Sequence, residues 1–292
     1  QTSLFFKQPL TMIIPARWYA GGKGLDEFRT KMLNENKISD LVDYSDSSEC
    51  FNGVNIAGGV CYFLWQRDYL GECNVYNNKN GLCASKMKRK LGEYDYFIRD
   101  NIAYDIIKKI NLISKTFMDK VVFSRNYFGI PTTIKENGGN IRVLTSKGII
   151  QVSENCINDK MNYLNKYKVI ITYAMSGGNK PTSGQNYQIL SSLKVLEPNE
   201  ACSETYLILQ VFDDKEKSYN LVSYASTKFF RFLLLQALSS IHITKDKFCF
   251  VPIQDFSKPW TDAELYAKYN LTQEEIDFIE SMIKPMDLGG GE

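Results

Sequence analysis

Residues 10–33 read LTMIIPARWYAGGKGLDEFRTKML, and this stretch decides the fold class. Its first five residues form an apolar run that Pro15 stops, which is typical of a short strand. A glycine-rich loop at residues 21–24 follows, and a helix is expected from about Asp26 to Leu33 with its apolar residues on one side. A strand, a glycine loop and a helix in this order indicate an α/β protein.

Two more strands are expected at residues 38–44 and 59–65, the second of them rich in aromatic and β-branched residues. Such a piece has apolar strand faces and unpaired edges that must be covered, so residues 1–76 are interpreted as part of a larger sheet. At residues 77–92 the composition changes to Asn, Lys, Gly and Ser, which is typical of a linker. We therefore expect a second domain at residues 93–292.

The second domain mixes helices with strands, and this pattern indicates an α+β fold. Helices are expected at about residues 95–112 and 219–237, and the later one is buried because it is apolar almost all round. Strands are expected at residues 120–123, 141–144, 148–152, 168–173 and 206–212. Two capping boxes, Thr261 with Glu264 and Thr272 with Glu275, predict the helices of a C-terminal helical cap.

The composition excludes several classes of protein. With 292 residues, of which 44% are hydrophobic and 23% charged, the chain is neither disordered nor fibrous. Seven scattered cysteines without a Cys-x-x-Cys pair indicate a reduced, cytoplasmic protein. His242 is the only histidine, so a histidine-rich zinc site is excluded. A Ser–His or Cys–His catalytic pair could be built only around His242. Neither a membrane helix nor a signal peptide is expected.

The near-neutral net charge of +2 hides an uneven distribution. Residues 79–125 contain eleven Lys or Arg and five acids, whereas residues 255–292 contain three Lys and nine acids. Aromatic residues are interleaved with the basic stretch, as in proteins that bind nucleic acids. The same pattern also fits core aromatic residues with a solvated charged face between them, and both interpretations stay open.

Few groups in the sequence have the spacing of a chemical site. The loop containing Lys23 and the loop containing Lys180 fit contact with phosphate, and both also fit plain turns. Asp43, Asp46 and Glu49 lie close together, but no lysine follows at the spacing of a nuclease site, so no metal is expected there. The acidic C-terminal helices fit a solvated cap and also a surface for a protein partner.

Longer runs carry a resemblance to a known family. They read MIIPARWYAGGKGLDEFR at residues 12–29, VNIAGGVCYFLW at 54–65, YNLVSYASTKFFRFL at 219–233, WTDAELY at 260–266 and LTQEEI at 271–276. The chain resembles the adenine-specific (N6) DNA methyltransferases of type II restriction–modification systems, in the part that ends with the target-recognition domain. The resemblance implies a partial Rossmann-like methyltransferase sheet at residues 1–76, a basic linker at 77–92 and an α+β target-recognition domain at 93–292.

The chain departs from this family in the parts that carry catalysis. Such enzymes hold S-adenosylmethionine with a glycine-rich loop and the flipped adenine with an Asn-Pro-Pro-Tyr loop. This sequence has no Pro-Pro pair, and its glycine stretches lack the context of the cofactor loop. We therefore expect no catalytic, cofactor-binding or metal-binding residue here, and an inactive chain on its own. Cofactor and catalysis would belong to the complete enzyme, on another chain or a missing part.

The expected partner is double-stranded DNA, with a chain that carries the amino-terminal methylase half, or a restriction subunit, as a further partner. The residues expected to contact DNA are Arg17, Lys23, Lys88, Arg89, Lys90, Arg125, Tyr127 and Lys180. Two other functions stay open, a stand-alone DNA-binding specificity subunit and a restriction endonuclease subunit. The endonuclease is disfavoured because no pair of acidic residues is followed by a lysine at the spacing of a nuclease site.

Overall fold

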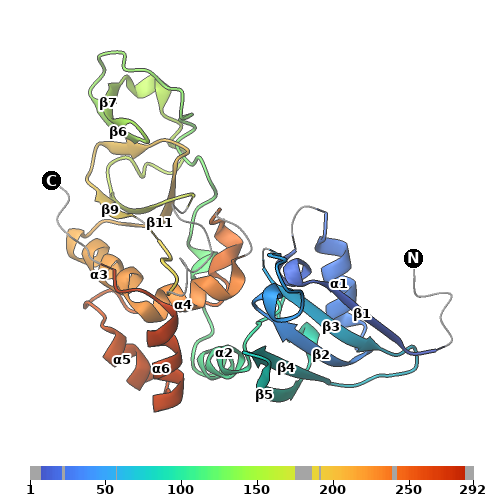
Figure 1. The fold of residues 1–292 in the computed structure, drawn as a ribbon. Coiled ribbons are helices and arrows are strands. Elements are labelled where there is room, and N and C mark those ends of the chain that lie inside the picture. The colour runs from blue at the N-terminus through green and yellow to red at the C-terminus, as the bar shows by residue number, and fades with distance from the viewer. Residues whose placement is uncertain are drawn as a thin grey trace. The chain divides into compact units, whose positions relative to one another are not determined.

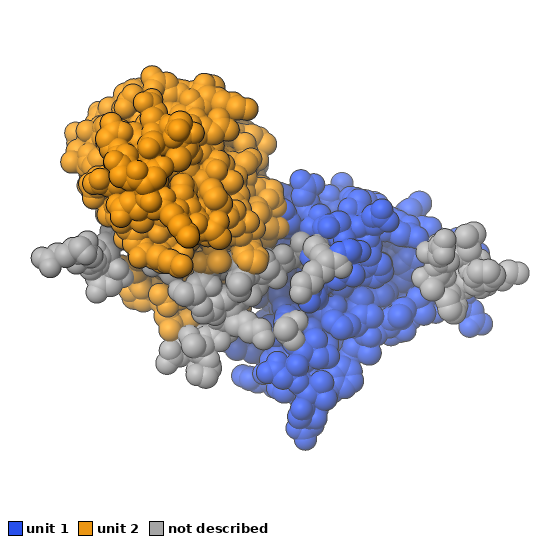
Figure 2. All heavy atoms as spheres, turned by 90° about the horizontal axis from the view of Figure 1, so that it is seen from above, with its two compact units in different colours: residues 1–106 blue, residues 107–292 orange. Residues whose placement is uncertain are grey.

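The computed structural model describes residues 8–21, 24–56, 58–174, 186–190, 192–238 and 242–286. The chain divides into two compact units, unit 1 at residues 1–106 and unit 2 at residues 107–292 (Figure 2). This division lies beyond the linker expected at residues 77–92. The expected linker is instead part of the unit 1 sheet, so the boundaries of the two domains are corrected accordingly.

Unit 1 is built on a mixed five-stranded sheet with the strand order β1-β3-β2-β4-β5 (Figure 1). Its strands are β1 (Leu10–Pro15), β2 (Ile38–Tyr44), β3 (Val60–Trp65), β4 (Cys73–Lys79) and β5 (Leu82–Arg89). Strands β1 and β2 each run antiparallel to β3, which lies between them, so they are parallel to each other. Parallel strands need a crossover connection, and helix α1 (Asp26–Asn34) forms part of it.

Strands β4 and β5 form a hairpin that turns at Asn80 and Gly81. Both residues have positive φ angles, 54° and 72°, as a two-residue type I′ turn requires. Strand β5 is an edge strand with exposed lysines, and this protects the edge from pairing with other chains. The polar composition that predicted a linker therefore belongs to a solvated edge hairpin.

The core of unit 1 lies on one face of this sheet. It contains Trp18, Leu33, Leu41, Phe63, Val75 and Phe97. Because side chains alternate along a strand, the neighbouring positions form the other face. There Ile13 pairs with Tyr62 across β1 and β3. Their side chains are 44% and 37% exposed, so this part of the second face is open to solvent.

Unit 2 contains two three-stranded sheets, with the orders β10-β6-β7 and β11-β8-β9. Their strands are β6 (Ile141–Thr145), β7 (Gly148–Val152), β8 (Tyr167–Thr172), β9 (Leu193–Leu196), β10 (Glu200–Cys202) and β11 (Tyr206–Phe212). Residues from both sheets share one core cluster, which includes Val143, Val152, Ile170 and Ile208. The strand expected at residues 120–123 is wrong, because residues 118–120 form a 3-10 helix and an irregular segment follows.

The remaining helices are α2 (Asn101–Ile113), α3 (Lys215–Ser226), α4 (Lys228–Ala237), α5 (Asp262–Lys268) and α6 (Gln273–Met282). The single helix expected at residues 219–237 is therefore two helices. Thr227 separates them, because its backbone is extended and its side chain accepts a hydrogen bond from the N–H of Phe230, which caps α4. Both expected capping boxes are confirmed at the starts of α5 and α6. No helix in the described ranges is long and apolar enough to cross a membrane.

Candidate nucleic-acid interface

The eight residues expected to contact DNA are placed differently in the two units. Lys23 and Lys180 lie outside the described residues. Arg17 is exposed on a short 3-10 helix (Ala16–Ala20), between the buried residues Ala16 and Trp18. These two buried neighbours anchor the turn in the core of unit 1 and leave the guanidinium of Arg17 in solvent.

The three consecutive basic residues at 88–90 lie at the end of strand β5, which ends at Arg89, and in the extended residue that follows it, Lys90. Side chains of extended backbone alternate between two sides, so Lys88 and Lys90 lie on one side and Arg89 on the other. Both lysines are exposed, and neither makes an ion pair with a residue that the structure describes. Lys86 lies on the same side as Lys88, with its ammonium 5.0 Å from the centre of the Tyr76 ring. Lys86 and Lys88 of β5, together with Lys90 directly after the strand, are called the basic row of β5.

Arg89 is 3% exposed and has a structural role. Its guanidinium lies 4.8 Å from the ring centre of Phe97 and 4.7 Å from that of Tyr104, and one nitrogen donates a hydrogen bond to the carbonyl of Arg99. Burial lowers the pKa of Arg89 to about 10. The expectation that Arg89 grips phosphate is corrected, because in this conformation the side chain fills the core.

Unit 2 contains a cavity of about 720 Å³ that brings together Arg125 and Tyr127, two of the residues expected from the sequence. Residues from four separate segments line it. They are Lys120, Val121, Val122, Phe123, Ser124, Arg125, Asn126, Tyr127, Tyr163, Lys166, Gln210, Val211 and Lys245. We call this the unit 2 cavity, and its volume is within the range of sites that bind small molecules.

Three aromatic rings form one wall of the unit 2 cavity. The ring of Phe123 meets those of Tyr127 and Tyr163 edge-on, with ring centres 5.1 and 5.5 Å apart, and the two tyrosine rings are stacked at 5.7 Å. The hydroxyl of Tyr127 donates a hydrogen bond to Asp159, which also accepts one from the backbone N–H of Tyr163. These bonds hold the side chain of Tyr127 and the backbone of Tyr163 in place. Burial and the bond to Asp159 raise the pKa of Tyr127 to about 12, so its hydroxyl stays protonated.

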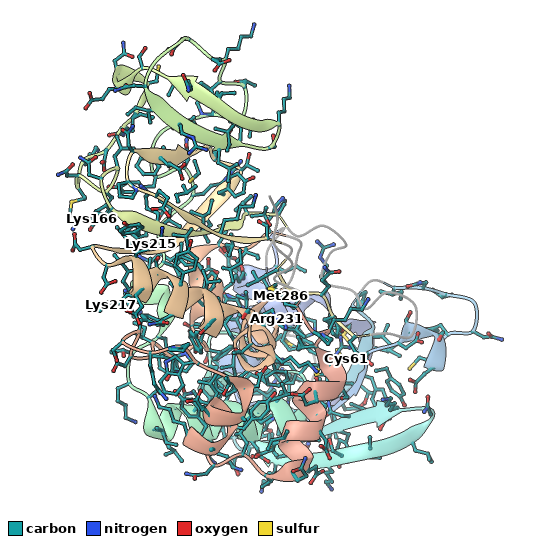
Figure 3. All side chains as sticks on the ribbon, turned by 90° about the vertical axis from the view of Figure 1, so that its left-hand side faces the viewer. Cys61, Lys166, Lys215, Lys217, Arg231 and Met286 are labelled. Carbon is teal, nitrogen blue, oxygen red and sulfur yellow. The ribbon has the colours of Figure 1, made fainter. Side chains whose placement is uncertain are left out.

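Four basic residues and no carboxylate line the unit 2 cavity. Acids beside it pair with three of them, Lys120 with Asp119 at 2.7 Å, Arg125 with Glu204 at 3.2 Å and Lys166 with Asp213 at 3.0 Å. Figure 3 labels Lys166 on the side of unit 2 where Lys215 and Lys217 are also seen.

Lys245 is the fourth basic residue of the cavity. It is exposed, and within the described ranges it makes no ion pair. The guanidinium of Arg125 also lies 4.4 Å from the ring centre of Tyr173, which stacks on His242. The cavity therefore joins positive charge to an aromatic surface, the combination that proteins use to bind nucleic acids.

The acids that the sequence places close together have separate structural roles. Asp43 is buried and accepts hydrogen bonds from Arg99 at 2.6 and 2.9 Å and from the hydroxyl of Tyr19 at 3.0 Å. Asp46 caps a short 3-10 helix, and Glu49 accepts a hydrogen bond from the N–H of Gly81. In the part of the chain that the structure describes, no three His, Cys, Asp or Glu side chains lie together where they could hold a metal ion.

Sequence reasoning missed the members of the cavity beyond residues 120–127, among them Tyr163, Lys166 and Lys245. They lie far along the chain from Arg125, and nothing in their local sequence separates them from other surface residues. Only the fold brings them beside the segment at residues 120–127.

Comparison with known proteins gives one family match and one curated relative. The model of the Eco57I restriction-modification methylase family matches residues 4–51. A protein of Mycoplasma pneumoniae, described as an uncharacterized adenine-specific methylase, is 32% identical over 130 residues. That match covers 41% of this chain and 31% of the relative, so the match spans less than a third of the relative's length. Together they confirm the resemblance to adenine-specific methylases of restriction–modification systems.

A solved structure, that of the type IIG restriction endonuclease BpuSI, aligns with 94% of this chain and 42% of its own chain. The sequence identity is 12% and the TM-score is 0.35, a level of likeness that does not establish a shared fold.

Proposed function

We propose that this chain is the DNA-recognition portion of an adenine-specific DNA methyltransferase of a restriction–modification system. The observation that carries the proposal is the unit 2 cavity, where Arg125 and Tyr127 meet further basic and aromatic residues and no carboxylate. The methylase family match supports the same class of enzyme. In this proposal unit 2 is the target-recognition domain, and the protein acts on duplex DNA in the cytoplasm.

Unit 1 has features of an incomplete methyltransferase sheet. Two parallel strands, β1 and β2, are joined through helix α1, with the antiparallel strand β3 between them. A β-α-β crossover is also the building unit of Rossmann-like sheets, whose neighbouring strands are mostly parallel. Strand β1 is at the edge of the sheet, and the neighbouring face around Ile13 is open to solvent. A paired neighbour and a covering layer, supplied by an amino-terminal methylase part, would complete this arrangement.

Among the residues that the structure describes, those after strand β1 do not fit S-adenosylmethionine. A 3-10 helix (Ala16–Ala20) separates strand β1 from Gly21, whereas a nucleotide cofactor needs glycine in the tight turn directly after a strand. Gly21 is explained by its backbone, because its φ of 67° and ψ of −154° form a conformation that residues with a Cβ rarely adopt. In this proposal the cofactor and the methyl-transfer step belong to the complete enzyme.

The role of this chain is to hold the duplex. The basic row of β5 and the cations of unit 2 would contact phosphates, which fixes the position of the protein on DNA, while polar side chains would read base edges. The target adenine would turn out of the helix into a pocket on the amino-terminal part, where the methyl group is transferred.

Selection from a random duplex library tests recognition by the chain alone. The chain is mixed with random 20-base-pair duplexes, the bound fraction is recovered, and the rounds are followed by sequencing. We expect one short motif that contains adenine to be enriched. Binding that stays equal for all sequences would contradict recognition, and so would the absence of binding at about 50 mM salt, where phosphate contacts are strongest.

A stand-alone specificity subunit would give the same enrichment. It would differ in gaining no methyl transfer from any methylase partner.

A further inference from the structure

We infer that the unit 2 cavity binds a single nucleotide of DNA that has left the base stack, with its base against the aromatic wall and its phosphate on Lys166 and Lys245. This inference rests on the proposed function, because it takes DNA as the source of the nucleotide. It adds to that function a second place for an unstacked nucleotide, separate from the pocket for the target adenine.

The charges of the cavity favour an anion. The cavity is lined by four basic side chains and no carboxylate, and the acids that pair with Lys120, Arg125 and Lys166 lie outside the lining. Lys245 is exposed and is left without an ion pair by the described residues, so binding a phosphate there breaks no existing pair. Lysine ammonium groups bind phosphate as compact point charges.

The aromatic wall distinguishes a nucleotide from a simple anion. Phe123, Tyr127 and Tyr163 pack as one cluster, and hydrogen bonds to Asp159 hold the hydroxyl of Tyr127 and the backbone of Tyr163 before any ligand arrives. Aromatic side chains in basic grooves stack on bases, and this contact tolerates any base because each has a π face. A site that binds phosphate alone does not require aromatic side chains.

The wall also requires a base that is out of the duplex. Inside a duplex the faces of each base are covered by its neighbours, so only their edges can be contacted. A base that stacks on protein side chains must leave the helix or belong to a single strand. Ser124, Asn126 and Gln210 also line the cavity, and their hydroxyl and amide groups can bond the edge of such a base.

The test compares two single strands with the same number of phosphates. One is a fluorescently labelled strand of five thymidines, and the other has the same length and label but abasic sites. Binding to the full chain is measured by fluorescence anisotropy in low salt. We expect the thymidine strand to bind about 5-fold to 150-fold more tightly, the range that corresponds to stacking of one base. Equal affinity would overturn the inference, because phosphates alone would then account for binding.

Variants connect this difference to the cavity. Lys245→Glu should weaken binding of the thymidine strand at least about fivefold, whereas Lys194→Glu, an exposed lysine of β9 outside the cavity, should change it less than twofold. Tyr163→Leu should remove the advantage of thymidine over abasic strand. Lys245 is exposed, so its variant remains informative if Tyr163→Leu does not fold. Equal effects of Lys245→Glu and Lys194→Glu would place binding elsewhere and refute the assignment.

The outcome also separates this inference from the proposed function. If the duplex selection yields a motif while the two single strands bind equally, recognition stands and the nucleotide site is refuted. If the cavity variants weaken binding of the thymidine strand while no duplex binds to the chain, the nucleotide site stands and duplex recognition is refuted.

Discussion

Replacing Lys88 and Lys90 together with alanine should weaken binding of duplex DNA and make it less sensitive to salt. Both lysines are exposed on the basic row of β5, and among the described residues neither has an acidic partner to release. If each contacts one phosphate, the slope of log K against log salt should become shallower by about 0.9 per contact, or about 1.8 in all. The wild-type protein should then lose about tenfold more affinity than the variant between about 50 and 200 mM salt.

The assay is fluorescence anisotropy with a labelled random-sequence duplex at several salt concentrations. Arg89→Ala is the matched control, because Arg89 lies between these two lysines in the sequence but is buried against Phe97 and Tyr104. It should leave the slope unchanged and lower the free energy of unfolding by about 2 kcal/mol, measured in urea. Phosphate contact by Lys88 and Lys90 is refuted if the double variant keeps the wild-type slope, or if Arg89→Ala flattens the slope without lowering stability.

Three further predictions concern stability and self-association, and each depends on contacts within one of the two units. Asp43→Ala should lower the free energy of unfolding by about 3–5 kcal/mol in urea, because Arg99 is left without its buried partner; a loss below about 1 kcal/mol would contradict this. Burial lowers the pKa of Lys168 to about 8, below the value of about 10.4 in an unfolded chain, so unfolding binds a proton between these pH values. Wild-type stability relative to Lys168→Met should therefore rise by about 3 kcal/mol as the pH rises from 8 to 10.5, and a constant difference would refute the shift. The edge strand β1 should promote self-association, and Ile13→Lys should reduce it in sedimentation velocity; identical sedimentation of both proteins as monomers would count against an open edge.

The strands with a clear apolar pattern were predictable from the sequence. Residues 38–44, 148–152 and 206–212 form strands with the expected bounds, because each has enough apolar side chains to show which face is buried. Strand β5 was missed because its exposed face consists of lysines, although Asn80-Gly81 already signals a hairpin. The break between α3 and α4 was missed because one threonine that caps a helix is a weaker signal than the apolar residues on both sides.

The candidate site was only partly predictable for a related reason. Arg125 and Tyr127 belong to one basic and aromatic segment, so local composition identifies them. Lys245 and Tyr163 come to line the same cavity only when the sheets and helices of unit 2 pack together. Their spacing in the sequence does not predict that they lie beside Arg125 and Tyr127. Arg89 shows the opposite error, since a run of basic residues does not reveal that strand alternation buries its middle member.

Methyl transfer from labelled S-adenosylmethionine to duplex DNA tests most directly whether this chain recognises DNA for a methylase portion that carries out catalysis. The chain is assayed alone, then with the amino-terminal portion of a related adenine methylase that carries the cofactor loop and the Asn-Pro-Pro-Tyr loop, and that portion is also assayed alone. We predict transfer to adenine only when both portions are present, because one holds the duplex and the other carries out the reaction. Transfer by this chain alone, or no transfer by the two portions together when both are folded, would contradict the account.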